Sequence, residues 1–72
     1  MNKTQKVKKH LTQYGNITSW EAINLYGVTR LASIIYNLRQ DGYDIRTIMI
    51  DDVDRYGEPN KYARYVYKGQ IL

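Results

Sequence analysis

A chain of 72 residues allows one small domain, residues 1–72, with a thin core, because it buries only about 60% of its unfolded surface. Its 11 Lys and Arg outnumber 7 Asp and Glu, giving a formal net charge of +4, which favours a polyanionic partner such as nucleic acid. The absence of cysteine excludes disulfides, thiolate chemistry and most structural zinc sites. Without a long apolar run or an apolar signal core, we expect a cytoplasmic protein that does not enter a membrane.

The first expected helix covers residues 4–14. In it Val7, Leu11 and Tyr14 recur at helical spacing, and lysines occupy the other faces. We expect His10, which lies among these lysines, at the surface.

A short extended segment and a second helix follow. Gly15 is suited to end the first helix in the left-handed conformation, and residues 16–18 predict a short strand that pairs with a later one. The second helix, residues 19–26, begins with a capping box in which the Thr18 hydroxyl and the Glu21 carboxylate bind each other's backbone N–H groups.

A turn interrupts the helical pattern before the third helix, residues 30–41. Gly27 supplies the positive φ that ends the second helix, and Val28 is expected to hold the turn against the core. Thr29 is the expected N-cap of the next helix. A turn of about three residues makes the two helices cross at a steep angle.

The third helix has one apolar stripe and one polar face without acids. Leu31, Ile34, Ile35 and Leu38 form the stripe, and no acid occurs on the helix before Asp41. Such a face suits base edges in a B-DNA major groove, although a plain solvated helix face remains the alternative. The residues that we expect to contact DNA from this helix are Thr29, Arg30, Ser33, Tyr36, Asn37 and Gln40.

After Gly42 the apolar period changes to two, which predicts a β-hairpin of residues 44–51 and 61–68 with a long tip. Both alternating sets contain apolar residues. We favour the alternation that leaves Arg64 in water; its inward set is Ala63, Tyr65 and Tyr67.

The run ITSWEAINLYGVTRLASIIYNLRQDGYDI, followed by KYARYVY, resembles a small helix-turn-helix family common in bacteriophage and prophage genomes. The resemblance covers roughly residues 4–68. It implies an α+β winged helix-turn-helix fold, with three helices, a short first strand and a C-terminal hairpin wing, and by analogy it implies DNA binding. Ile23 and Ser33 stand where repressor-type motifs have a small residue and an aliphatic one, so we expect a different helix packing.

Phosphate contacts are expected from other parts of the chain. Carboxylates at Asp51, Asp52, Asp54 and Glu58 repel phosphate, so either Arg55 alone projects toward DNA or the wing does not touch it. The additional candidates are Ser19, Lys6, Arg55 and Lys61.

Two functions follow from these patterns. The first is a non-enzymatic double-stranded DNA-binding protein of phage or prophage type, a transcriptional regulator or accessory recombination factor in the bacterial host cytoplasm. The alternative is a protein-binding winged helix that inhibits or modulates a host nuclease or polymerase complex through its hairpin, with Tyr56 free for the partner. A homodimer or tandem sites would supply enough base contacts. His10 has no nucleophile or carboxylate nearby, so we expect no enzyme and no cofactor.

Overall fold

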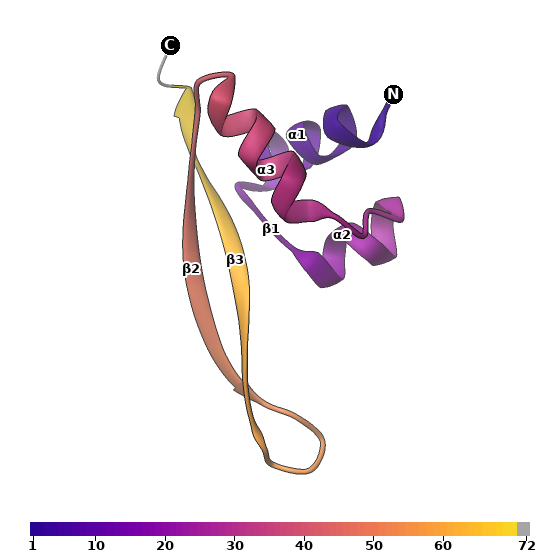
Figure 1. The fold of residues 1–72 in the computed structure, drawn as a ribbon, viewed down its shortest axis with the longest axis vertical. Helices are drawn as coiled ribbons and strands as arrows, with labels where there is room; N and C mark the ends of the chain where they lie inside the picture. The colour runs from indigo at the N-terminus through magenta and orange to yellow at the C-terminus, as the bar shows by residue number, and fades with distance from the viewer. Residues whose placement is uncertain (71–72) are drawn as a thin grey trace.

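The structure, a computed structural model, describes residues 1–70 and consists there of three helices and a three-stranded antiparallel sheet (Figure 1). The strand order is β1-β3-β2. The expected α+β fold with a C-terminal hairpin is confirmed. Its elements are α1 (Lys3–Tyr14), β1 (Asn16–Thr18), α2 (Ser19–Tyr26), α3 (Leu31–Gln40), β2 (Tyr43–Val53) and β3 (Pro59–Gln70).

Capping boxes begin the first two helices. The Thr18 hydroxyl accepts from the Glu21 N–H at 3.3 Å, and the Glu21 carboxylate accepts from the Thr18 N–H at 2.9 Å, as predicted. Asn2 and Gln5 form a second box at the start of α1. Sequence reasoning missed this second box, although its spacing is that of the first.

The turn before α3 is one residue longer than expected. Gly27 ends α2 with a φ of 66°, and Val28 is buried, both as predicted. The prediction that Thr29 caps α3 is wrong: Arg30 holds the N-cap position, with φ −123°, ψ 53° and no side-chain cap hydrogen bond. The first hydrogen bonds of α3 go to the Arg30 carbonyl, from the N–H groups of Ser33 and Ile34 at 3.2 and 3.5 Å, so the helix begins at Leu31.

The core draws on every element. Tyr65 and Tyr67 of β3 pack against it, so their predicted inward orientation is confirmed, whereas Ala63 is half-buried and is not among the residues packed against the core. The prediction that Arg64 lies in water is wrong. Arg64 is half-buried and donates to the Asn16 Oδ1 at 2.7 Å, because β1 pairs alongside this part of β3. Within residues 1–70 the buried apolar residues are Val7, Leu11, Ile17, Ala22, Val28, Leu31, Ile35, Leu38 and Ile45.

His10 is a core residue, and its expected surface position is wrong. Only 5% of it is exposed, and its Nδ1 lies 2.7 Å from the Tyr26 hydroxyl. The ring stacks at a tilt on Tyr14, 4.7 Å between centroids. Helical spacing places His10 beside Leu11 and Val7, so this hydrogen bond satisfies a polar group where α1 meets α2.

The hairpin extends well beyond the helices (Figure 1), and the longest dimension of the molecule is 43 Å. Its strands are paired from Tyr43↔Gln70 to Val53↔Pro59, so the tip is shorter than expected. Asp54 closes the tip, since its Oδ1 accepts from the backbone N–H groups of Tyr56 and Glu58.

Arg39 joins α3 to the outer edge of the sheet. Its Nε donates to the Ile45 carbonyl at 2.8 Å, and its Nη2 donates to the Thr47 hydroxyl at 2.9 Å. Strand β2 is an edge strand, so Arg39 covers part of a backbone edge that is otherwise open.

Candidate nucleic-acid interface

The outer face of α3 is exposed and carries no charge along its middle. Leu31, Ile35 and Leu38 are buried under the helix, whereas 62% of Tyr36 is exposed. The exposed positions between the buried ones include four predicted site residues: Ser33, Tyr36, Asn37 and Gln40. These four side chains therefore lie on one exposed side of α3.

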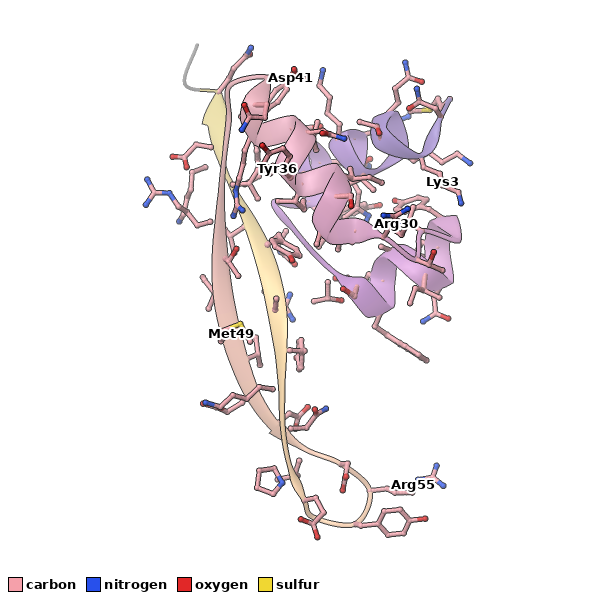
Figure 2. All side chains as sticks on the ribbon, viewed as in Figure 1. Lys3, Arg30, Tyr36, Asp41, Met49 and Arg55 are labelled. Carbon is pink, nitrogen blue, oxygen red and sulfur yellow. The ribbon has the colours of Figure 1, made fainter. Side chains whose placement is uncertain are left out.

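The start of α3 adds cations to this surface. A depression of about 290 Å³ brings Lys3 of α1 together with Thr29, Arg30 and Ser33. Figure 2 shows Lys3 and Arg30 near each other where α1 and α3 begin. Two cations and two hydroxyls next to a helix N-terminus, which carries partial positive charge, suit a phosphate group.

Lys3 was not among the DNA contacts predicted from the sequence. It stands four residues before Val7, so helical spacing places it on the inward side of α1, one turn before the core begins. The predicted phosphate ligand Lys6 lies elsewhere, in a depression between α1 and α2 that it shares with Lys9 and Leu25.

Ser19 also lies apart from the α3 face. It lines a groove of about 510 Å³ between the start of α2 and the hairpin, with Trp20, Tyr62 and Arg64. Trp20 is 74% exposed. This groove and the α3 face come from different elements, so the structure does not bring Ser19 next to Asn37.

The hairpin contributes one cation at its tip. Figure 2 shows Arg55 in the loop that joins β2 and β3, and this residue is exposed. Lys61 lies 3.7 Å from Asp51, and both side chains are more than two-thirds exposed. Such an exposed ion pair adds little stability, but it partly neutralises both charges near the tip.

Farther from the tip, a second ion pair occupies another basic residue. The Arg46 guanidinium donates to both oxygens of Asp44, at 2.7 and 3.2 Å, and holds the pKa of that carboxyl below its usual value. Lys8 lies 4.8 Å from the ring centroid of Tyr43, and the polar interaction of the amine with the Tyr43 side chain raises the pKa of the amine. Both cations are therefore engaged within the protein, whereas no ion pair joins Lys3 or Arg55 to an acid within residues 1–70.

A helix-turn-helix followed by a long hairpin defines a winged helix-turn-helix protein. The family model described as a winged helix-turn-helix domain matches residues 3–68, and the chain belongs to this family. Domains of this kind are typically non-enzymatic and bind DNA, so membership supports a regulatory DNA-binding kind of function. No curated protein and no solved structure matches the chain. No helix within residues 1–70 is long and apolar enough to cross a membrane.

Proposed function

We propose that the protein binds double-stranded DNA without catalysis and inserts α3 into the major groove. We further propose that it is of phage or prophage type and acts in the bacterial cytoplasm as a transcriptional regulator or accessory recombination factor. The observation that carries this proposal is the exposed, acid-free face of α3, flanked at its start by Lys3 and Arg30.

The side chains of α3 divide by chemistry into base readers and phosphate ligands. The amides of Asn37 and Gln40 suit adenine, which offers one donor and one acceptor in the major groove. The Tyr36 ring offers apolar contact with a thymine methyl group. At the start of the helix, Arg30 suits guanine or phosphate, and Ser33 suits a phosphate oxygen.

Contacts with the DNA backbone orient the reading helix. Lys3, Thr29 and Arg30 would hold one phosphate at the start of α3, and Arg55 would reach the backbone from the tip of the wing. We rank Ser19, Lys6 and Lys61 as secondary contacts, because the first two line other depressions and the third lies beside a carboxylate. A homodimer or two tandem sites would extend the short run of bases that one α3 reads.

Selection of binding sites from a random duplex pool, followed by fluorescence anisotropy, tests this function. Asn37→Ala should weaken binding to the selected site by about 1–3 kcal/mol and relax the sequence preference of the protein, because an amide that pairs with a base is lost. Asn24→Ala is the matched control, since Asn24 is exposed on α2 and donates to the Trp20 carbonyl of the same helix. A pool without enriched sequences, or equal affinities for the two variants, would contradict base reading by α3.

The alternative function, binding of a host nuclease or polymerase complex, has support in the hairpin. Met49, Val53 and Tyr56 are 57%, 61% and 83% exposed, among carboxylates. Co-purification of such a complex with the protein tests this function. Loss of the complex in Tyr56→Ala but not in Asn37→Ala would favour this function over DNA reading.

A further inference from the structure

A second surface lies between α1 and α2. Two adjoining depressions, of about 490 and 350 Å³, share His10, Tyr14, Leu25 and Tyr26. Their linings include no residue of α3 or of the hairpin. We call the pair of depressions the α1–α2 groove. Because it is separate from the α3 face, it stays open when α3 contacts DNA.

The groove exposes apolar side chains that the core does not use. Tyr14 and Leu25 are 62% and 59% exposed, and α2 buries only Ala22 completely. The bottom of the groove is formed by His10 and Tyr26, whose Nδ1 and hydroxyl oxygen are hydrogen-bonded at 2.7 Å. Large exposed apolar side chains around a hydrogen-bonded pair suit the apolar side chains of a partner.

The rim of the groove is basic. Lys6 and Lys9 line one of the two depressions. The single acid in the lining, Glu21, accepts hydrogen bonds from the backbone N–H and hydroxyl of Thr18 at the start of α2. The other acids of the chain occupy residues 41–58, at the end of α3 and on the hairpin. The groove therefore combines a positively charged rim with exposed apolar side chains.

We propose that the α1–α2 groove binds an acidic amphipathic helix of a partner protein. Apolar residues at i, i+3 and i+4 of that helix would contact Tyr14 and Leu25, and flanking carboxylates would pair with Lys6 and Lys9. A second copy of the chain does not offer such a helix, because α1 and α3 contain no acid and α2 contains only Glu21. The protein thereby has its main DNA surface on α3 and a separate surface for a protein, and Lys6, ranked above as a secondary DNA contact, belongs to the protein surface in this proposal.

The probe for this proposal is a synthetic peptide of about 16 residues, long enough to form a helix, with leucines along one face and glutamates beside them. Its controls are a peptide of the same composition with the leucines spread around the helix, and a peptide with lysine in place of glutamate. Titration into the ¹⁵N-labelled full chain should shift the amide signals of Tyr14, Leu25 and their neighbours. Neither control peptide should bind comparably.

Matched variants locate the site. Leu25→Ser should weaken peptide binding at least about tenfold, as removal of a central interface residue does. Ile23→Ser should bind as the parent does, since Ile23 is exposed on the same helix but does not line the groove. Lys9→Glu should also weaken binding, whereas Lys3→Glu should not. DNA affinity of Leu25→Ser should stay unchanged, which separates a failure of this proposal from a failure of DNA binding.

Three results would overturn the proposal. One is a parent chain that does not distinguish the acidic peptide from its controls. Another is equal peptide affinity for Leu25→Ser and Ile23→Ser. The last is a dimer of the chain alone, detected by light scattering and lost in Leu25→Ser, which would assign the groove to a second copy.

Discussion

Gly27 separates the two helices of the motif through its backbone conformation. Its φ of 66° lies in the left-handed region, and nothing lies within 4 Å of a Cβ placed on it. A side chain at this position would meet backbone strain but no steric clash. The turn between α2 and α3 therefore favours glycine for its left-handed backbone conformation and not for lack of space.

We expect Gly27→Val to destabilise the protein by about 1–2 kcal/mol or more, because left-handed backbone is costly and most costly for β-branched residues. Thermal unfolding should shift by about 4–8 °C for each kcal/mol in a domain of this size. Gly27→Asn should lose less, since Asn tolerates this region. An unchanged melting temperature for the valine variant would refute a left-handed turn at Gly27.

The buried hydrogen bond between His10 and Tyr26 makes a second prediction at this scale. Tyr26→Phe should destabilise the protein by about 1–3 kcal/mol, because it leaves the His10 Nδ1 unsatisfied in the core. Tyr14→Phe is the control and should stay within about 0.5 kcal/mol, since Tyr14 is 62% exposed. Chemical unfolding measures both variants. Equal stabilities would mean that the hydrogen bond contributes nothing.

Among the elements, the hairpin depends on α3 through Arg39. Arg39→Met keeps the aliphatic stem but loses the hydrogen bonds to the Ile45 carbonyl and the Thr47 hydroxyl. We expect a loss of about 1 kcal/mol in the free energy of unfolding. The comparison is Arg30→Met, whose parent side chain makes no cap hydrogen bond. If the two variants unfold alike, Arg39 does not anchor the edge strand.

Local signals predicted the elements better than their ends. The Thr18 and Glu21 capping box and the glycine at position 27 are short-range chemistry, and the structure has both as expected. The start of α3 could not be read in this way, because Thr29 has the residue type of an N-cap, whereas Arg30 holds the N-cap position without a side-chain cap hydrogen bond. The predicted exposure of Arg64 was wrong because Arg64 donates to Asn16 of β1, which lies 48 residues away in the sequence.

The packing of the helices in the whole molecule determines which lysines lie near α3. The polar face of α3 follows from its periodicity, so the exposure of Asn37 and Gln40 could be predicted from the sequence. Lys3 and Lys6 look alike in sequence, but the packing of α1 directs Lys3 to the start of α3 and Lys6 to the α1–α2 groove. The burial of His10 also depends on the packing of α1 against α2. The neighbouring lysines in the sequence led to the wrong prediction that His10 is exposed.

The salt dependence of DNA affinity tests the central claim most directly. If Lys3 and Arg30 contact phosphate, the affinity of the parent chain for duplex DNA should fall linearly on a log–log plot, with a slope of about −0.9 for each phosphate neutralised. Lys3→Ala should reduce that slope by about 1 and weaken all sequences alike, whereas Lys6→Ala should change it less. A flat salt response, no binding at low salt, or equal slopes for the parent and Lys3→Ala would contradict the account.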